Sequence, residues 1–330
     1  MKIFIAGNSR SGTTMMSRIL GNHDDVFSFQ ELHFFDELLP ENKPAVIPSF
    51  EKSVSLYATL CAIQRNGYFG PRKTAPFREE ARSVLGNQKY DYLEVFEKFL
   101  SEETRKNGKH ISCEQTPQSI FAIQTILDKF PDARCIIMVR DPREVLLSQK
   151  YKWKRRKLSG GKIPLREAIR AWINYHPVTI SKLWKAVADI TLSYRDHPAV
   201  KIIKYEDLVL RPTETIRSVC THCDIIFSEA MLDIPVTGSS GSGDSESKRG
   251  VDPSKLNQWE KGGINASEIS LCLEINGKLM QKFGYKIRPE NGNTILKAWY
   301  RYSMPFQLAT ALLFNLKRLR NIDKLVKRFF

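Results

Sequence analysis

Short apolar runs alternate with helix-like segments along most of this chain. Apolar residues at helical spacing predict helices over Thr13–Leu20, Glu51–Arg65, Asp91–Lys106, Ser119–Phe130, Leu165–Val187, Asp252–Trp259 and Ala266–Phe283. Five runs of four or five residues are typical of buried strands, and they are Lys2–Ala6, Val26–Phe29, His110–Glu114, Cys135–Val139 and Val200–Lys204. This alternation predicts a three-layer α/β fold with a mainly parallel central sheet flanked by helices, in which the strand ends carry the site.

The loop between the first strand and the first helix has the features of an anion-binding site. Gly7 and Gly12 can adopt backbone angles that are closed to other residues, and the helix begins at Thr13, so unpaired N–H groups converge at its positive end. The glycine spacing is that of a Walker A loop, but Thr13-Thr14 replaces the Lys-Ser/Thr pair of that motif. The cation is Arg10, inside the loop. Because a nucleoside triphosphatase needs that lysine and a magnesium ion, we expect an anion other than ATP and no metal.

Two later segments place charged or hydroxyl side chains after predicted strands. Glu31 follows the second strand, in the sequence Gln-Glu-Leu-His-Phe-Phe that also contains His33. The fourth strand leads into Arg140, and Asp-Pro then opens a helix whose second turn carries Ser148. On this placement alone, a helix-start or surface carboxylate is the preferred interpretation of Glu31.

These segments together resemble the sulfotransferases that use 3′-phosphoadenosine 5′-phosphosulfate (PAPS). The sequence Arg-Ser-Gly-Thr-Thr matches their 5′-phosphosulfate loop in its arginine form, and a strand-end Arg followed by Ser matches their 3′-phosphate site. A Glu at this distance beyond the loop is the general base in carbohydrate and tyrosylprotein members. The resemblance implies a P-loop-like fold and sulfuryl transfer from PAPS. It implies catalytic roles for Glu31, Arg10 and His33, and cofactor binding by Arg10, Ser11, Gly12, Thr13, Thr14, Arg140 and Ser148.

Two further segments are similar to the same family. The sequence Tyr-Glu-Asp-Leu beginning at Tyr205 recurs after a strand in that family, where the tyrosine lies near the adenosine. A structural tyrosine whose hydroxyl caps a loop explains Tyr205 equally well. The Gly/Ser-rich segment Thr237–Gly250 predicts a mobile loop, and the corresponding family segment folds over the nucleotide. Its candidate phosphate ligands are Ser240, Lys248, Arg249 and Gly250.

The chain departs from the family at Gln115. Many relatives have Glu-Lys-Thr-Pro after the third strand, and their Lys can help to stabilise the departing phosphate, whereas this chain has Glu-Gln-Thr-Pro. An amide donates a hydrogen bond but cannot neutralise charge, so Arg10 is left to carry that role. Two alternatives stay open: a P-loop-type small-molecule kinase, and a sulfotransferase-like protein that binds PAPS or an anionic glycan without turnover.

The composition adds a strong positive charge. The 330 residues include 51 Lys and Arg against 36 Asp and Glu, and the net charge of +15 suits an anionic cofactor, an anionic acceptor or a membrane surface. The run Lys150–Lys157 interleaves basic and aromatic residues. It could bind nucleic acid, a sulfated acceptor or cofactor phosphates, and a solvated helix end explains it equally well. Within the resemblance we expect no nucleic-acid partner.

The cysteines and the N-terminus indicate the cytoplasm. The six cysteines are scattered, which is typical of a reduced protein, and Cys220 and Cys223 share an apolar helical stripe that favours core packing over zinc binding. No apolar signal segment precedes the first strand. We therefore expect a cytoplasmic enzyme, with peripheral contact at the inner face of the membrane through its C-terminal tail.

The predicted domain organisation is a sulfotransferase domain over residues 1–290 and a basic tail over 291–330, with an acceptor-covering insert at about 40–109. In the tail, eight basic residues face one acid, Asp323, and the apolar run Phe306–Phe314 is shorter than the roughly 20 residues that span a bilayer. We expect that run to pack on the domain and the last dozen residues to form an amphipathic membrane contact. The run from Glu31 to Phe35 resembles heparan-modifying members, which favours a carbohydrate or glycolipid hydroxyl as the acceptor.

Overall fold

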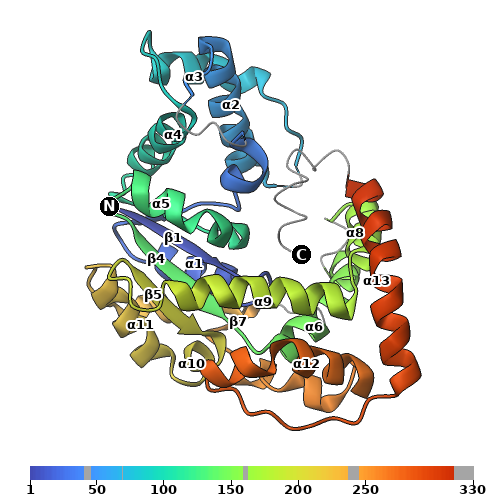
Figure 1. Ribbon diagram of the computed structural model, residues 1–330. Helices are drawn as coiled ribbons and strands as arrows, with labels where there is room; N and C mark the ends of the chain where they lie inside the picture. The colour runs from blue at the N-terminus through green and yellow to red at the C-terminus, as the bar shows by residue number, and fades with distance from the viewer. Residues whose placement is uncertain (41–45, 69, 159–162, 237–244, 316–330) are drawn as a thin grey trace.

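A five-stranded sheet forms the centre of the molecule, with strand order β2-β3-β1-β4-β5 and parallel pairing throughout (Figure 1). The computed structural model describes residues 1–40, 46–68, 70–158, 163–236 and 245–315. The predicted α/β fold with a mainly parallel sheet is confirmed, and so are the five predicted strands. Their bounds are β1 (Lys2–Gly7), β2 (Val26–Ser28), β3 (Ile111–Glu114), β4 (Arg134–Val139) and β5 (Val200–Lys204).

The two faces of the sheet bury separate hydrophobic clusters because side chains alternate along each strand. Ile3 and Ile5 of β1 pack in the cluster that contains residues of α1 (Thr13–Gly21), α10 (Tyr205–Leu210) and α11 (Pro212–His222). Phe4 and Ala6 belong to the opposite cluster, which contains residues of η3 (Pro117–Ala122), α5 (Ile123–Lys129), α6 (Pro142–Lys150), α9 (Pro177–Ser193) and α12 (Ala266–Lys282). All six cysteines are buried and free, as the core interpretation of Cys220 and Cys223 requires.

A helical insert connects β2 to β3 and rises above the sheet at the top of Figure 1. It begins with the π-helical turn η1 (Phe34–Leu38), and its last helix starts at a capping box in which the side chains of Asp91 and Glu94 accept from each other's backbone N–H groups. The predicted helices Glu51–Arg65 and Asp91–Lys106 are therefore confirmed. The insert consists of α2 (Phe50–Asn66), η2 (Ala75–Phe77), α3 (Arg78–Leu85) and α4 (Tyr92–Lys106).

The structure differs from the prediction at two of the helices. The single helix predicted over Leu165–Val187 is two helices, α8 (Leu165–Ile173) and α9, because Pro177 cannot continue a helix but starts α9 at its first position. Trp172 lies within that predicted helix, where the apolar spacing predicts a core position, but it is 67% exposed. Instead of a helix, Asp252–Trp259 contains the short turns η6 (Pro253–Lys255) and η7 (Gln258–Lys261). Between α6 and α8 lie η4 (Lys152–Lys154) and α7 (Arg155–Leu158).

The chain after residue 230 adds a small strand pair and a long terminal helix. After η5 (Glu229–Leu232), β6 (Pro235–Val236) pairs antiparallel with β7 (Ser245–Arg249), so this part of the predicted loop is a strand. The helix α13 (Thr294–Asn315) stands beside α8 at the right of Figure 1.

The predicted packing of the run Phe306–Phe314 on the domain is wrong for Phe306, Leu313 and Phe314, which are exposed. The last dozen residues, proposed as a membrane contact, lie outside the described part of the chain. No described helix combines the length and apolar character that a bilayer crossing needs.

Candidate active site

The carboxyl ends of the five strands open onto one edge of the sheet, and a residue that the sequence analysis discussed follows each of them closely. Parallel pairing brings these ends together, which is the usual place for a ligand in an open α/β sheet. After the first strand the loop residues Ser9–Gly12 lead into α1. The residues that follow the other four strands are Glu31 after β2, Gln115 after β3, Arg140 after β4 and Tyr205 after β5.

The loop before α1 has a backbone that few side chains would allow. Gly12 has a φ of 92°, and a Cβ placed on it would lie 2.6 Å from the ring of Tyr205. Arg10 has a φ of 75°, which is uncommon for a residue other than glycine. The N–H groups of the first turn of α1 therefore point out of the loop beside an arginine, as an anion site requires.

A small hollow of about 130 Å³, which we call the nucleotide hollow, lies at this helix end. It brings together several residues that were predicted as site residues from separate segments of the sequence. Its walls include Gly12, Thr13, Thr14, Arg140, Tyr205 and Gly250. Residues from the first strand–helix loop, the ends of β4 and β5, and the segment after β7 thus meet in one place.

Arg140 is held in the nucleotide hollow by four contacts, one of them a hydrogen bond of 3.4 Å from its Nη2 to the carbonyl oxygen of Lys255. Its Nη1 donates to the carbonyl oxygen of Arg10 at 3.1 Å, and its Nη2 donates to Glu144 Oε2 at 2.9 Å. Its guanidinium lies 4.2 Å from the centre of the Tyr205 ring. Its buried Nε has no hydrogen-bond partner among the described residues. Arg140 is therefore fixed in position while its Nε still lacks a partner among the described residues.

The two predicted serines differ in their surroundings. The buried hydroxyl of Ser11 has no hydrogen-bond partner in the described part of the chain. Ser148, expected beside Arg140, instead accepts a hydrogen bond from Arg10 Nε at 2.9 Å and does not line the hollow. Ser11, like Ser148, is not among the residues that line the hollow. The unsatisfied Arg140 Nε and the absence of a side chain at Gly12 fit a phosphate-bearing ligand such as PAPS.

Of the candidate phosphate ligands in the segment Thr237–Gly250, the structure places Gly250 in the wall of the nucleotide hollow. Gly250 has a φ of 93°. Arg249 points elsewhere, because it is 51% exposed and forms an ion pair with Asp233. Ser240 and the side chain of Lys248 lie outside the described residues.

A larger cleft of about 690 Å³, which we call the acceptor cleft, adjoins the hollow. The two cavities share wall residues, and the shared set is Ser9, Arg10, Thr14, Glu31, Pro117 and Arg155. Glu31 and Arg10 therefore stand where the two cavities meet. A group bound in the hollow and a hydroxyl bound in the cleft would both be in reach of them.

Glu31 is paired with His33. The Nε2 of His33 lies 3.4 Å from Glu31 Oε2, and its Nδ1 lies 2.9 Å from Asp36 Oδ2. Burial opposes the charge on the imidazole, but hydrogen bonds to Asp36 and Glu31 overcome it and raise the pKa of His33 to about 10. His33 is thus an imidazolium at neutral pH, fixed between two carboxylates, and it orients Glu31.

Buried side chains hold the Glu31 segment in place. Phe34 stacks on Phe96 of the insert with ring centres 4.0 Å apart. The hydroxyl of Thr116 accepts from the N–H of His33 at 3.2 Å and donates to the carboxylate of Glu114. Burial raises the pKa of Glu114 to about 7, with its hydrogen bonds opposing that effect. The Glu-Gln-Thr-Pro sequence therefore positions Glu31 from the end of β3.

The acceptor cleft contains cations that the sequence left undecided or did not suggest. Lys152, Arg155 and Arg156 of the basic run line it, which favours the anion-binding interpretation of that run over a solvated helix end. Arg170 also lines it, although no sequence motif pointed to this residue. Desolvation, with added repulsion from Arg155 and Arg140, lowers the pKa of Arg10 to about 9, which leaves it protonated at neutral pH.

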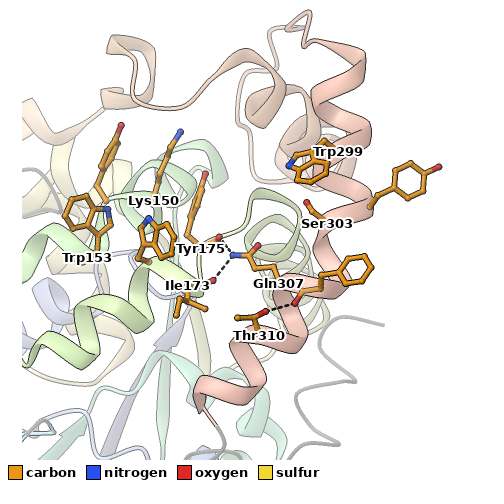
Figure 2. Close-up of a pocket in the computed structure, with 12 residues that line it drawn as sticks. Lys150, Trp153, Ile173, Tyr175, Trp299, Ser303, Gln307 and Thr310 are labelled. Carbon is orange, nitrogen blue, oxygen red and sulfur yellow. Dashed lines mark hydrogen bonds between the residues drawn. The ribbon is translucent and has the colours of Figure 1, made fainter.

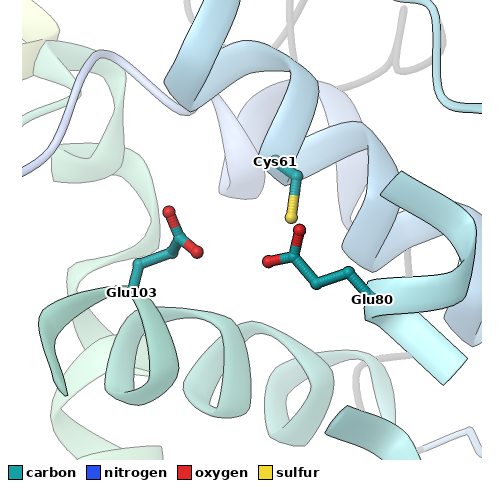
Figure 3. Close-up of side chains that lie close together, drawn as sticks. All are labelled: Cys61, Glu80 and Glu103. Carbon is teal, nitrogen blue, oxygen red and sulfur yellow. The ribbon is translucent and has the colours of Figure 1, made fainter. Parts of the chain in front are cut away.

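A separate cluster of potential metal ligands lies in the helical insert. Ligand atoms of Cys61, Glu80 and Glu103 lie within 4.8 Å of one another, and Figure 3 shows the three side chains converging. Arg65 donates to both carboxylates, at 2.6 Å to Glu80 and 2.9 Å to Glu103. Burial raises the pKa of the Cys61 thiol to about 12, so it stays protonated. We interpret this cluster as an ion-pair network that joins α2, α3 and α4.

Comparison with known proteins points to one family. Residues 2–229 match the model of a sulfotransferase family. A protein-tyrosine sulfotransferase of Drosophila melanogaster is 24% identical over 235 residues, which cover 70% of this chain but 39% of the fly protein. The sulfotransferase domain of the curacin biosynthetic pathway aligns over 87% of this chain and 98% of its own length, with 19% identity and a TM-score of 0.51. The sulfotransferase domain of the Synechococcus PCC 7002 olefin synthase aligns over 87% and 95%, with 15% identity and the same TM-score.

Proposed function

The chain belongs to the sulfotransferase family, a family of transferases, and we propose that it moves a sulfuryl group from PAPS to an acceptor hydroxyl. One observation carries this proposal. Arg10, Thr14 and Glu31 line both the nucleotide hollow and the acceptor cleft, so an anion-stabilising loop and a carboxylate face the same junction. A base on one side and a cation on the other is the arrangement that in-line group transfer needs.

On the donor side, the residues of the nucleotide hollow would bind the two phosphate groups. The N-terminus of α1 and Arg10 would hold the 5′-phosphosulfate, and the Nε of Arg140 would gain a partner in the 3′-phosphate. Tyr205, stacked on Arg140, forms the wall beside them. When bound, PAPS supplies a sulfuryl group whose bond to the 5′-phosphate oxygen breaks as the acceptor oxygen bonds to sulfur.

On the acceptor side, Glu31 would act as the general base. Its carboxylate accepts the proton of the acceptor hydroxyl, and His33 and Thr116 hold the segment that carries it. Gln115 lies in the wall of the cleft where many relatives have Lys. Arg10, Lys152 and Arg155 are the cations that can take over charge stabilisation there.

The acceptor we propose is a carbohydrate or glycolipid hydroxyl. Amide side chains of Gln30, Asn66, Gln118 and Asn174 line the cleft and suit a polyhydroxylated group. Sulfation of a sugar series and of a tyrosine peptide would be compared, since the fly relative is named for tyrosine. Transfer to the peptide alone would overturn the carbohydrate assignment.

We place the protein in the cytoplasm with peripheral contact at the inner face of the membrane. The net charge of +15 and the exposed Trp299, Tyr302 and Phe306 of α13 support this placement. Co-sedimentation with vesicles of phosphatidylglycerol but not of phosphatidylcholine is expected. Recovery of the same amount of protein in the pellet when vesicles are left out would contradict the membrane contact.

The donor assignment is tested by calorimetry of 3′-phosphoadenosine 5′-phosphate and ADP without magnesium. The 3′-phosphorylated ligand is expected to bind more tightly, and Arg140→Ala is expected to weaken it about 10- to 100-fold because one charged hydrogen-bond partner is lost. Arg105→Ala is the control, since Arg105 is 72% exposed on α4 in the insert.

The other outcomes of nucleotide binding and transfer distinguish the three candidate functions. A preference for ATP with magnesium would overturn the sulfotransferase proposal in favour of a kinase, which the family match does not support. Tight binding of 3′-phosphoadenosine 5′-phosphate with no transfer to any acceptor would indicate a binding protein without turnover. Transfer that is lost in Glu31→Gln would establish the enzyme.

A further inference from the structure

Three exposed tryptophans gather in a single groove. The chain has five tryptophans, and Trp184 and Trp259 are buried. Trp153, Trp172 and Trp299 are 40%, 67% and 65% exposed, and all three line a groove of about 760 Å³ that we call the aromatic groove. Figure 2 shows Trp299 on α13 facing Trp153 across it. Its walls are built from α13, α8 and the turn at η4.

The two helices of the groove also turn apolar stripes toward solvent. On α8 the exposed apolar residues Leu165, Ile169 and Trp172 recur at helical spacing. On α13 the same spacing links Ile295, Trp299, Tyr302, Phe306 and Leu313, which are all more than 60% exposed. Contiguous exposed apolar surface of this kind marks a binding site in a folded protein.

Hydrogen bonds hold the groove open. The side-chain amide of Gln307 on α13 donates to the carbonyl oxygen of Ile173 at 2.6 Å and also to that of Tyr175 (Figure 2). Tyr175 in turn donates to Glu268 at 2.7 Å, and Lys150 pairs with the same carboxylate at 2.8 Å. These bonds fix α13 to the end of α8, so the aromatic walls are positioned rather than collapsed on each other.

The aromatic groove continues into the acceptor cleft. Trp153 lines both cavities. On either side of the boundary, Tyr151 lines the groove and Lys152 the cleft, and on α8 Trp172 lines the groove and Ala171 the cleft. One apolar cavity and one polar, cationic cavity are therefore separated only by the turn at η4 and the end of α8.

We propose that the aromatic groove binds the hydrocarbon chain of a glycolipid acceptor while its headgroup lies in the acceptor cleft. This inference rests on the proposed function, because it assigns the acceptor of that reaction. The hydroxyl reaches Glu31, and an acidic linkage between headgroup and chain would meet Lys152 and Arg156. The groove volume is within the usual range for a ligand pocket, and its aromatic lining suits an alkyl chain.

The location of the tryptophans allows a direct binding test. The probe is dodecyl maltoside carrying two bromine atoms on its chain, used below its micellar concentration, since bromine quenches tryptophan that it contacts. Saturable quenching is expected, because three of the five tryptophans line the groove. Maltose and unbrominated dodecyl maltoside should not quench, and the latter should compete with the probe.

Matched variants locate the binding. Phe306→Glu is expected to weaken binding of the probe about tenfold, because it places a charge in an apolar wall. Ile226→Glu is the control, since Ile226 is 83% exposed and Phe306 77%, and Ile226 does not line the groove. No saturable quenching, or equal weakening by both variants, would overturn the proposal. Sedimentation of a dimer that Phe306→Glu converts to monomer would overturn it in favour of a second copy of this chain.

The two proposals fail in different ways. If 3′-phosphoadenosine 5′-phosphate binds and the brominated chain does not quench, the groove assignment is wrong and the proposed function stands. If the chain quenches but the nucleotide does not bind, the proposed function is wrong and this acceptor assignment falls with it. Once transfer is measured, kcat/KM should rise at least tenfold from methyl to dodecyl glycosides in the wild type. That rise should be absent in Phe306→Glu and kept in Ile226→Glu.

Discussion

The nucleotide hollow and the acceptor side of this protein are built in different ways. The hollow takes its residues from the loop before α1, the ends of β4 and β5, and the segment around Gly250. The acceptor cleft and the aromatic groove take theirs mainly from helices and turns, including the insert, η4, α8 and α13. The positions of the residues in the hollow thus depend on local backbone geometry at strand ends. The positions of the residues on the acceptor side depend on the packing of helices that are far apart in the sequence.

This difference would allow the acceptor side to change while the donor side is kept. Moving Arg140 or Gly12 would require moving a strand of the parallel sheet, since each follows a strand directly or through one tight turn. The end of α8 can change with few consequences for the sheet, because its outward residues touch solvent. Variants on the two sides should therefore affect donor binding and acceptor use separately.

The largest effect is expected for Glu31→Gln at the junction of the two cavities. Loss of the general base should lower the transfer rate about 10²- to 10⁴-fold, while the affinity for 3′-phosphoadenosine 5′-phosphate stays within about twofold. Glu97→Gln is the control, because Glu97 is 39% exposed against 37% for Glu31 and pairs with Lys2. Both values come from initial-rate kinetics and calorimetry. A parallel loss of nucleotide affinity would show that Glu31 contributes to donor binding as well as to transfer.

Gly12→Ala tests the claim that backbone geometry determines the hollow. The new Cβ would meet the Tyr205 ring at 2.6 Å at a φ of 92°, so we expect a loss of about 2–3 kcal/mol in unfolding free energy, together with weaker nucleotide binding. Gly108→Ala shares a positive φ of 67° and has open space around the new Cβ. This control should cost about 1 kcal/mol and leave nucleotide affinity unchanged. Urea unfolding measures both variants. Equal losses of unfolding free energy would show that the contact with Tyr205 does not contribute to the effect of Gly12→Ala.

Glu114 provides a pH-dependent test at the end of β3. Its pKa is raised to about 7 in the folded protein from 4.5, so the folded state binds the proton more tightly. Stability should therefore fall as pH rises from about 4.5 to 7, by roughly 2 kcal/mol. Glu114→Gln keeps an acceptor for Thr116 and should abolish this fall. Urea unfolding at pH 5 and pH 7.5 compares the two, and a wild type whose stability rises relative to the variant would refute the prediction.

The smallest effect is expected for the stability of Trp172→Ala on the acceptor side. Trp172 is 67% exposed, so the free energy of unfolding should change by less than about 0.5 kcal/mol. Trp184→Ala, which removes a tryptophan that is 2% exposed, should cost about 3–5 kcal/mol. Thermal and urea unfolding would measure both. A large loss in Trp172→Ala would mean that the groove is part of the core.

The sequence predicted the sheet and the donor side because both depend on local patterns. The apolar runs that form β1 to β5 are short and continuous, and Gly12, Arg140 and Tyr205 lie within a few residues of strand ends. The contact between Ser148 and Arg10 was not predicted, since 138 residues separate them. The roles assigned to these residues stay predictions until the variants are measured.

The acceptor side was beyond sequence reasoning for a physical reason. Apolar periodicity predicts that a helical stripe is buried, and it cannot distinguish a stripe that faces the core from one that faces a ligand. Trp172 was therefore placed in the core, and the stripe on α13 was treated as packing. Arg170 carried no motif at all, because its place in the cleft depends on how α8 ends before Pro177.

The wall shared by the two cavities has a thermodynamic consequence. Arg10, Thr14 and Glu31 belong to both, so a ligand that orders them in one cavity changes the free energy of binding in the other. Such linkage is reciprocal, and a nucleotide that tightens acceptor binding must itself be held more tightly when the acceptor is present. Under the proposed reaction, the same wall would let the spent nucleotide and unreacted acceptor bind together, in a complex that cannot react. Excess acceptor should then slow turnover by trapping the product, which makes substrate inhibition a property of this architecture.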